Sequence, residues 1–505
     1  MDRKLTVFYT SDIHGCFAPV DYARSSFAPS GLANCAANFE NDGNTLILDG
    51  GDTIQGSPFT YWLYSRTEER SLLPAKLMNL AGFQFVTLGN HDFNYGTAEL
   101  ERFLAALDAK CLCANVEGLR YAEKTAVVTL RNGLRVGLTG VTTQDIPLWE
   151  KPENIAGLRF RDAFETARDM LAELKRQGAD VTICIYHGGF ECDLDSGARL
   201  TAKKENQGYR MCRELDFDLL LTGHQHMPFA DRCICGTHSC QPPDKARQYI
   251  RVDAAVDGEG RFSANSRLLP AGSRTPAAFS ELLEEPEKKL AAFLDTPLGH
   301  LDSPLPSADP LDRALHGSLI ANFFNQVQHD ASGADLSATC LSNSVPGFPE
   351  NVTLRDIVSN YEFPNTLRTI RVDREIIKKA LERSAAYFCL GEDGAPHVSR
   401  EFLVPVVQHF NFDYLSGIEA TVDLRRPVGE RVSSMLWHGG ELPEDQTLTL
   451  CLNNYRASGA GGYAFYADCE TVSELPDEIS ELIIRYVDRN RYIAVDRRQW
   501  LHVIY

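Results

Sequence analysis

Short apolar runs alternate with helical patterns along the first half of the chain. The apolar runs have the length and composition of buried strands and lie at residues 5–10, 45–48, 83–88, 134–140, 180–186 and 217–221. Between them, apolar residues recur at helical spacing over residues 100–107 and 163–174, and Gly178 stands where a C-terminal helix cap is expected. This alternation predicts an α/β layered domain.

Polar side chains follow five of these strands directly. Because side chains beyond the carboxyl ends of strands converge in open α/β sheets, we expect these residues to lie together. Seven of them are candidate metal ligands: Asp12, His14, Asp52, Asn90, His187, His224 and His226. Imidazole, carboxylate and amide groups suit first-row divalent ions such as Mn, Zn, Fe or Co. Seven ligands are more than one tetrahedrally coordinated ion takes, but they are enough for two ions that share a carboxylate. The alternative is a set of unrelated loop residues and core histidines.

Length, composition and net charge limit the number of domains and the kinds of molecule that the protein could bind. A chain of 505 residues is too long for one ordinary core, so we expect two domains. The net charge of −19 argues against a nucleic-acid polymer as partner. No apolar run approaches the ~20 residues of a membrane span, so no membrane partner is expected. The first residues show no leader pattern, which predicts a cytoplasmic protein, or an exported one if a leader was removed. The oligomeric state stays open.

The candidate ligands carry a resemblance to a known family. The motifs Asp12-x-His14, Gly51-Asp52, Gly89-Asn90-His91-Asp92, His187 and Gly223-His224-x-His226 resemble, in order and type, the ligand blocks of the calcineurin-like metallophosphoesterases. Residues 362–367, 381–388 and 454–459 resemble the C-terminal domain of the bacterial 5′-nucleotidase and 2′,3′-cyclic-nucleotide 2′-phosphodiesterase family. The resemblance covers nearly the whole chain.

This resemblance implies an architecture. We expect an α/β fold in which a layered α/β/β/α metallophosphoesterase domain is followed by a smaller α+β substrate-binding domain. The dimetal catalytic domain would span residues 1–270 and the 5′-nucleotidase-type C-terminal domain residues 311–505. Between them, residues 271–310 combine a charged helix from Ser280 to Leu294 with several prolines, which indicates a linker with a helix.

The resemblance also implies roles for the site residues. One divalent ion would be held by Asp12, His14, Asp52 and His226, and the second by Asp52, Asn90, His187 and His224, so that Asp52 bridges them. A water or hydroxide activated by the two ions would attack phosphorus in line. His91 would stabilise the transition state or protonate the leaving oxygen.

Asn94 distinguishes between two branches of the family. In 5′-nucleotidases an Asp usually stands three residues after this histidine, whereas the present chain has Asn94. An amide can orient His91 but cannot offset the charge of an imidazolium ion. The cyclic-nucleotide branch resembles the chain better at this position, and it also has the second histidine, His226.

A nucleoside substrate would need a flat apolar clamp, because bases bind by stacking on aromatic rings. By resemblance, Phe412 and Tyr463 would provide this clamp, and Asn454 and Arg456 would contact ribose or phosphate. The predicted function is hydrolysis of nucleotide phosphoesters: 2′,3′-cyclic nucleotides, 3′-nucleotides, 5′-nucleotides or several of these. The alternatives are a 5′-nucleotidase or UDP-sugar hydrolase, or a metallophosphatase with a non-nucleotide substrate. A binding protein without catalysis would have lost ligands, and none is missing.

Overall fold

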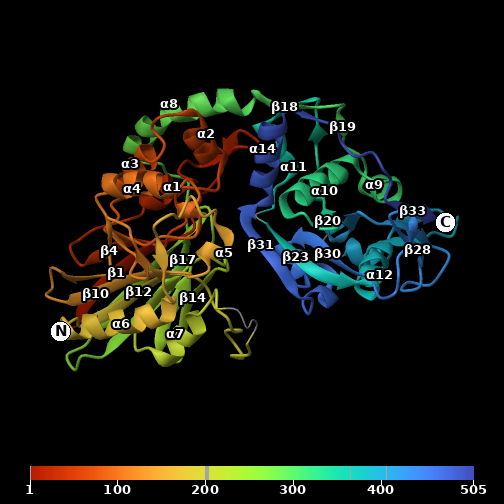
Figure 1. Cartoon of the computed structure of the whole chain (residues 1–505). Coiled ribbons are helices and arrows are strands. Elements are labelled where there is room, and N and C mark those ends of the chain that lie inside the picture. The colour runs from red at the N-terminus through yellow and green to blue at the C-terminus, as the bar shows by residue number, and fades with distance from the viewer. Residues whose placement is uncertain (1, 200–203, 364, 405–406) are drawn as a thin grey trace. The chain divides into compact units, whose positions relative to one another are not determined.

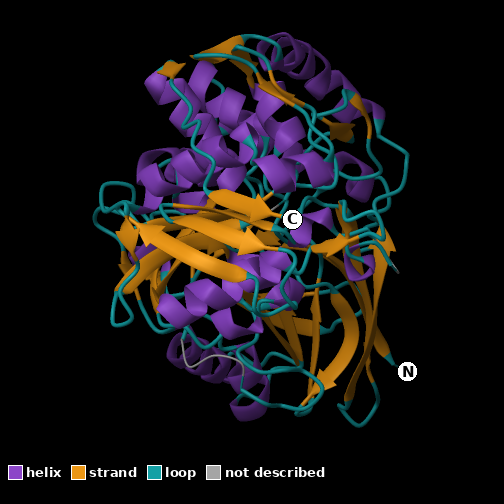
Figure 2. Cartoon of the chain, turned by 90° about the vertical axis from the view of Figure 1, so that its right-hand side faces the viewer, coloured by secondary structure: helices purple, strands orange, loops and turns teal. Residues whose placement is uncertain are grey.

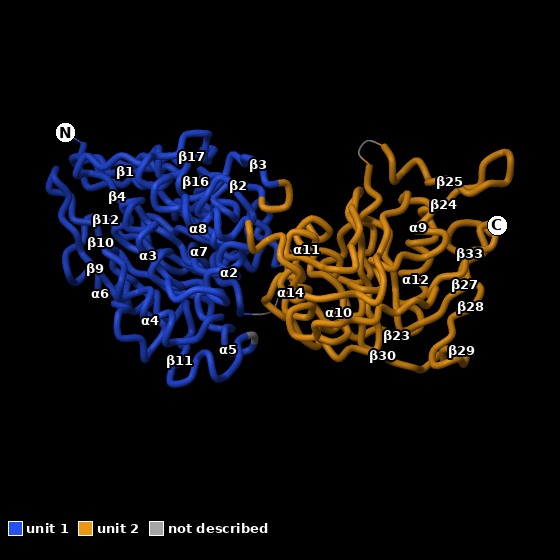
Figure 3. Tube along the Cα trace, turned by 90° about the horizontal axis from the view of Figure 1, so that it is seen from above, with its two compact units in different colours: residues 1–21, 25–291 blue, residues 22–24, 292–505 orange. Residues whose placement is uncertain are grey.

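Two structural units divide the chain. The computed structural model describes residues 2–199, 204–363, 365–404 and 407–505, so that Pro364 of the 362–367 motif lies outside it. Unit 1 comprises Met1–Asp21 and Ser25–Ala291, and unit 2 comprises Tyr22–Arg24 and Ala292–Tyr505 (Figure 3). Within the described residues, no helix combines the length and the apolar character that a bilayer crossing requires.

Two sheets form the centre of unit 1. The first has seven strands in the order β17-β16-β1-β4-β5-β6-β8. Their bounds are β1 Arg3–Thr10, β4 Thr45–Asp49, β5 Phe85–Val86, β6 Lys110–Leu112, β8 Ala122–Glu123, β16 Gln248–Val256 and β17 Phe262–Pro270. The strands β1, β4, β5 and β6 are parallel, so their carboxyl ends lie at one edge of the sheet.

The second sheet has six strands in the order β14-β15-β13-β12-β10-β9. Their bounds are β9 Thr125–Thr129, β10 Arg135–Thr142, β12 Val181–His187, β13 Leu219–Thr222, β14 Phe229–Ile234 and β15 Thr237–Gln241. The strands β10, β12 and β13 run parallel to one another. The strands expected from the apolar runs are therefore confirmed, although β5 is shorter than the run at residues 83–88.

Helices cover the outer faces of the two sheets. The inner faces share one apolar core, to which β1, β4, β10, β12, β13 and β16 contribute. The helices α6 (Ala163–Arg176) and α7 (Gly208–Glu214) pack on the outer face of the second sheet. The helices α3 (Leu72–Ala81) and α4 (Thr97–Ala106) lie on the side of β4 and β1 that faces away from β10 (Figure 1). The expected α/β/β/α layering is confirmed.

The longest of these outer helices, α6, shows how the sequence specifies an element. The Asp162 side chain accepts a hydrogen bond from the Glu165 N–H and so caps the amino end. The apolar stripe that includes Phe164, Leu171 and Leu174 is buried against the sheet. Gly178, with a φ of 75°, follows the carboxyl end in the left-handed conformation that favours glycine.

Unit 2 combines helices with strands that pair mostly antiparallel (helices and strands are coloured separately in Figure 2). Its five-stranded sheet has the order β26-β20-β30-β23-β31, with β20 Leu336–Cys340, β23 Thr366–Asp373, β26 Asp413–Ser416, β30 Thr447–Asn453 and β31 Thr471–Glu478. A four-stranded sheet follows the order β29-β28-β27-β33, with β27 Glu419–Asp423, β28 Val432–Trp437, β29 Gly440–Glu441 and β33 Leu501–Ile504. The expected α+β class of the second domain is confirmed.

The remaining helices complete the two units. Unit 1 contains α1 (Leu32–Ala36), α2 (Pro58–Arg66) and α5 (Ile146–Trp149). Unit 2 contains α9 (Pro310–His316), α10 (Leu319–Ser332), α11 (Leu354–Asn360), α12 (Arg374–Ala385), α13 (Asn454–Ala457) and α14 (Ile479–Asn490). The helix α8 (Ala277–Leu294) contains Pro286, and the boundary between the units falls near its end.

Gly140 lies where the backbones of the two sheets of unit 1 are in direct contact. Its carbonyl oxygen accepts a hydrogen bond of 2.7 Å from the Ala114 N–H just beyond β6. A Cβ atom at position 140 would lie 1.9 Å from the Leu112 carbonyl oxygen. Only a residue without a side chain allows this contact between strands of different sheets.

We expect Gly140→Ala to lower the free energy of unfolding of unit 1 by about 3 kcal/mol, because backbone atoms cannot move aside as a flexible side chain can. Scanning calorimetry would measure the change. The control is Gly258→Ala, where an added Cβ meets nothing within 4 Å. Equal unfolding temperatures for the two variants would contradict this account of the sheet packing.

Candidate metal centre

The predicted ligands lie at one edge of the two sheets of unit 1. Asp12 and His14 follow β1, Asp52 follows β4, and Asn90 follows β5. His187 is the last residue of β12, and His224 and His226 follow β13. The side chains that follow the first sheet, and that of His187, are almost completely buried. Burial of so many polar groups is costly unless they have partners.

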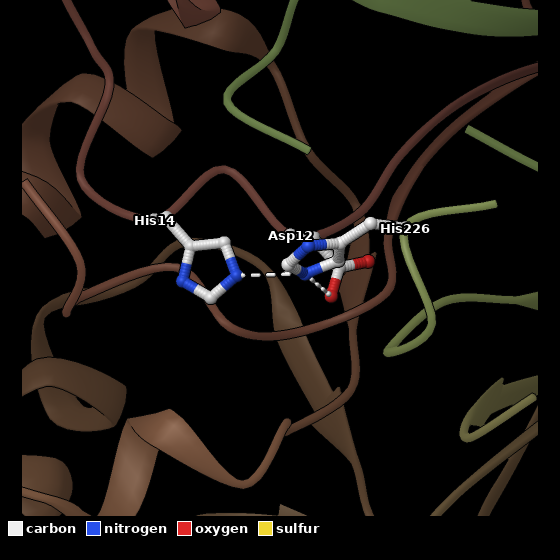
Figure 4. Close-up of side chains that lie close together, drawn as sticks. All are labelled: Asp12, His14 and His226. Carbon is white, nitrogen blue, oxygen red and sulfur yellow. Dashed lines mark hydrogen bonds and ion pairs between the residues drawn. The ribbon is translucent and has the colours of Figure 1, made fainter. Parts of the chain in front are cut away.

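Asp12, His14 and His226 form the first of two groups (Figure 4). The Nε2 atoms of His14 and His226 lie 3.1 Å apart. His226 Nε2 is also 3.3 Å from Asp12 Oδ1. Two imidazole nitrogens and a carboxylate oxygen thus lie close together, although His226 is more than 200 positions from Asp12 and His14 in the chain.

Asp52, His187 and His224 form the second group. His187 Nε2 lies 3.2 Å from Asp52 Oδ2. The same oxygen of Asp52 is 3.9 Å from His14 Nε2, which belongs to the first group. Asp52 therefore stands between the two groups, where a bridging carboxylate would be needed.

Three of the histidines have one ring nitrogen fixed by an oxygen acceptor. His14 Nδ1 lies 3.0 Å from the Gln55 carbonyl oxygen, and His187 Nδ1 lies 2.6 Å from that of Gly50. His224 Nε2 lies 2.8 Å from Glu205 Oε1. Because these oxygens only accept, each of these nitrogens is the donor, and the opposite nitrogen is the one that would bind a metal ion. Metal-ligating histidines are oriented in this way.

Two buried ligand atoms of the centre make no hydrogen bond among the described residues. They are Asn90 Oδ1 and His187 Nε2, the latter despite its short distance to Asp52. A divalent ion would satisfy both atoms, and imidazole, amide and carboxylate groups are suitable ligands for it. The residues present therefore fit metal ions.

Backbone strain is concentrated at the same residues. Asp12, His14, Asp52, His224 and His226 all have a φ between 50° and 70°. Residues with side chains adopt this left-handed conformation at a cost, and in folded proteins such residues cluster at functional sites. Five of the seven predicted ligands share it.

Asp92 holds together the two loops that carry Asp52 and Asn90. Its carboxylate accepts hydrogen bonds from four backbone N–H groups, those of Asp52, Thr53, Ile54 and Gly89, over 2.9–3.2 Å. In return, Asp52 Oδ1 accepts a hydrogen bond of 2.7 Å from the His91 N–H. These bonds fix the position of Asp52 relative to Asn90 before any ion binds.

The electrostatics of the centre favour added positive charge. Burial opposes an imidazolium ion at His187, but the neighbouring Asp52 and Asp12 carboxylates outweigh it and raise the pKa of His187 to about 10. Burial lowers the pKa of His14 to about 4. Burial and the nearby Asp52 raise the pKa of Asp92 to about 6 despite its backbone donors. A bound cation would take the place of the proton on His187.

His91 and Asn94 lie beside the first group. The rings of His91 and His14 are 5.4 Å apart. His91 Nδ1 lies 2.9 Å from Asn94 Oδ1. The structure thus places both predicted catalytic residues next to the ligands.

Two carboxylates near the centre have no signal in the sequence. Glu205 orients His224, and the buried Asp244 lies 4.0 Å from His226 Nδ1. Neither follows a strand that carries other ligands, and each resembles an ordinary loop residue in the sequence. Only the folded chain reveals their position.

The predicted aromatic clamp is wrong in its residues. Phe412 is 2% exposed and packs among Tyr387, Phe388 and Tyr414. Tyr463 is 0% exposed, and its hydroxyl group lies 3.0 Å from Ser384 Oγ. A base cannot stack on rings that the core of unit 2 already covers.

Arg456 is likewise a core residue and not a phosphate ligand. Its side chain is 1% exposed and its Nε donates to Asp413 Oδ1 over 3.0 Å. Its other nitrogens donate to Asn411 Oδ1 and to the carbonyl oxygens of Ala460 and Phe410. Asn454 remains half-buried, and its Oδ1 accepts from the Tyr455 N–H.

Comparison with known proteins agrees with this fold and site. Residues 5–228 match the calcineurin-like phosphoesterase family, and residues 297–468 match the family described as 5′-nucleotidase, C-terminal domain. A Staphylococcus aureus crystal structure, provisionally assigned as a 5′-nucleotidase and solved with α-ketoglutarate, is 34% identical with a TM-score of 0.70, and the match covers 99% of this chain and 100% of that one. The 2′,3′-cyclic-nucleotide 2′-phosphodiesterase/3′-nucleotidase of Salmonella typhimurium is 23% identical over 96% of this chain and 85% of its own length. The Haemophilus influenzae NAD nucleotidase shares the fold, with a TM-score of 0.70 at 17% identity over 100% of this chain and 99% of that one.

The chain belongs to the calcineurin-like phosphoesterases, in the group that carries a 5′-nucleotidase C-terminal domain. It is a metal-dependent phosphoric ester hydrolase by family. Enzymes of this family use dimetal centres, and the two ligand groups described above are the candidate sites for them.

We expect Asp92→Asn to weaken metal binding by about 10- to 100-fold, the range typical for loss of a group that orients metal ligands. One terminal atom of an asparagine is a donor, so backbone N–H groups of the two loops would lose their acceptor. Calorimetric titration with Mn²⁺ would measure the affinity. The control is Asp42→Asn, which makes the same charge change in an exposed loop. Equal affinities in the two variants would show that Asp92 does not position the ligands.

Proposed function

We propose that this protein hydrolyses nucleotide phosphoesters at a centre of two divalent ions, with 2′,3′-cyclic nucleotides among its substrates. The observation that carries the proposal is the position of Asp52 between the two ligand groups. Its Oδ2 atom is 3.2 Å from His187 Nε2 and 3.9 Å from His14 Nε2. Asp12, His14 and His226 would hold one ion, and His187, His224 and Asn90 the other.

When bound, such ions supply Lewis-acid chemistry for phosphoryl transfer, and Mn, Zn, Fe or Co suits these ligands. The protein contributes positioning. The His91 backbone N–H donates to the Asp52 carboxylate over 2.7 Å, and the ring Nδ1 lies 2.9 Å from Asn94 Oδ1, so both the backbone and the imidazole are held beside the ligands. In this position His91 would donate a hydrogen bond to the phosphoryl group or a proton to the leaving oxygen.

Two observations support the cyclic-nucleotide branch. Asn94 occupies the position at which 5′-nucleotidases usually have an Asp. The similarity to the Salmonella typhimurium phosphodiesterase/3′-nucleotidase extends over 96% of the chain. By contrast, the similarity to the Vibrio cholerae 5′-nucleotidase covers 45% of the chain at 29% identity.

A 5′-nucleotidase is the second candidate. The Staphylococcus aureus structure at 34% identity carries that provisional assignment. The metal ligands would be the same in both cases. The two candidates therefore differ in how the sugar is held and not in how phosphorus is attacked.

The first test is a comparison of substrates. We expect the Mn²⁺-loaded protein to hydrolyse 2′,3′-cyclic AMP and 3′-AMP faster than 5′-AMP, measured as kcat/KM for each. Treatment with a chelator should abolish the activity, and added Mn²⁺ should restore it.

Each other outcome of this test has a definite meaning. Cleavage of 5′-AMP alone would favour the 5′-nucleotidase candidate. Cleavage of aryl phosphates without any nucleotide would contradict the substrate class. Absence of all phosphoesterase activity with Mn, Zn, Fe and Co would contradict the function itself.

For the base we propose Phe363 and Phe410 in place of the buried rings. Both side chains are half-buried, and their ring centroids lie 6.3 Å apart. Phe410 neighbours the loop predicted from the family, because its carbonyl oxygen accepts a hydrogen bond from Arg456 Nη2. A partly exposed ring can stack on a base without loss of core packing.

We expect Phe410→Ala to lower kcat/KM for nucleotides by about 5- to 150-fold, because base–aromatic stacking contributes ~1–3 kcal/mol. Activity on an aryl phosphate should stay within about twofold of the original, since no base is bound. The control is Phe27→Ala, which removes an exposed ring in unit 1. Equal losses for nucleotide and aryl substrates would exclude base stacking at Phe410.

A further inference from the structure

A hydrogen-bonded chain extends from His91 away from the metal ligands. His91 Nδ1 lies 2.9 Å from Asn94 Oδ1. On its other side, Asn94 Nδ2 donates to Glu150 Oε2 over 2.5 Å. Glu150 stands directly after α5, 56 positions beyond Asn94 in the chain.

The carboxylate of Glu150 determines which way the Asn94 amide points. A carboxylate accepts hydrogen bonds and donates none. The atom of Asn94 that faces Glu150 is therefore the amide nitrogen, and the amide oxygen faces His91. Without such a neighbour, the oxygen and nitrogen of an asparagine could exchange places.

The amide in turn determines where His91 carries its proton. A carbonyl oxygen only accepts, so His91 Nδ1 must be the donor. Interactions of His91 with a phosphoester then go through Nε2, which donates when the ring carries a second proton and accepts when it does not. In the other neutral tautomer, Nδ1 would turn a lone pair toward the Asn94 oxygen and Nε2 could not accept a proton.

Glu150 is itself held in place. Its Oε1 accepts hydrogen bonds from Asn154 Nδ2 over 2.8 Å and from the Lys151 N–H over 2.7 Å. Asn154 Nδ2 also donates to the Asn94 carbonyl oxygen over 2.9 Å, and Thr97 N–H donates to the Asn154 carbonyl oxygen. The segments 94–97 and 150–154 are thus bonded to each other at several points.

We propose that Glu150 is a positioning residue for the phosphoesterase reaction: through Asn94 it holds His91 in the tautomer protonated at Nδ1. The proposal for Glu150 rests on the proposed function in one respect, namely that His91 acts on a phosphoester. It also extends the expectation that the Asn94 amide orients His91. The carboxylate is present, one amide group further away, so the pair of Asn94 and Glu150 replaces the single Asp of the 5′-nucleotidases.

The test exchanges the two side chains. In Glu150→Gln the new amide can donate or accept, so Asn94 is no longer held in one orientation. We expect kcat to fall by about 10- to 100-fold, a smaller effect than that of a wrong tautomer in a catalytic triad, with KM almost unchanged. In Asn94→Asp two carboxylates face each other, and we expect a similar loss.

The double variant Asn94→Asp with Glu150→Gln should recover most of the activity. The new carboxylate at position 94 would accept from His91 Nδ1, and the new amide at position 150 would donate to that carboxylate, so every bond of the chain is restored. We expect kcat within about threefold of the original. The control is Glu153→Gln, which removes the same charge from an exposed position nearby and should have no effect.

A second measurement does not depend on turnover. In the zinc-loaded protein labelled with ¹⁵N-histidine, in mildly alkaline solution, the His91 signals should show a protonated Nδ1. They should shift toward a mixture of tautomers in Glu150→Gln and return in the double variant. His91 is identified by the signal lost in His91→Gln.

Two outcomes would overturn the proposal: an unchanged His91 tautomer in Glu150→Gln, or a double variant no more active than the single ones. If the original protein hydrolyses no phosphoester, the proposed function fails instead. The tautomer measurement then still decides the role of Glu150.

Discussion

The hydrogen bonds to the Asp92 carboxylate are the interaction on which the rest of the site depends. A buried carboxylate is costly, and here the cost is offset by four backbone N–H groups from two loops. These loops follow β4 and β5 and carry Asp52 and Asn90. Because the same carboxylate bonds to both, the two ligands are fixed relative to each other by the protein alone.

The loops that carry Asp52 and Asn90 must also approach each other closely through their backbones. A Cβ atom on Gly51 would lie 2.2 Å from the Gly89 backbone nitrogen, so neither loop could approach the other with a larger residue there. The left-handed conformations of Asp12, Asp52 and His224 bring their side chains to the same edge. Such conformations persist only where surrounding bonds fix them. Here the Asp12 N–H donates to the Gly51 carbonyl oxygen, and the His224 N–H donates to the Asp12 carboxylate.

The sequence predicted that the candidate ligands lie together, but it did not predict the groups that support them, and the reason is physical. Asp, His and Asn directly after an apolar strand are unusual, so their positions carry information. Glu205, Asp244 and Glu150 lie in loops, where a carboxylate is ordinarily solvated, and their partners are distant in the chain. For Phe412 and Tyr463 the sequence instead suggested a functional role that the structure does not support, because both rings are buried in the core. An aromatic ring beside a glycine-rich loop has the same sequence pattern whether it faces solvent or the core, and only packing distinguishes the two.

The buried pair of Arg456 and Asp413 bears on which unit would bind the phosphate of a substrate. An arginine whose charge is neutralised and whose nitrogens donate to Asp413, Asn411, Ala460 and Phe410 has little capacity left for phosphate. On the proposed function, phosphate would then be bound at the strand ends of unit 1. Those ends carry Asp12 and Asp52 in a protein of net charge −19, so only bound cations can make them attractive to a phosphoester. On the proposed function, metal binding would therefore serve affinity as well as chemistry, and unit 2 would recognise the sugar and the base.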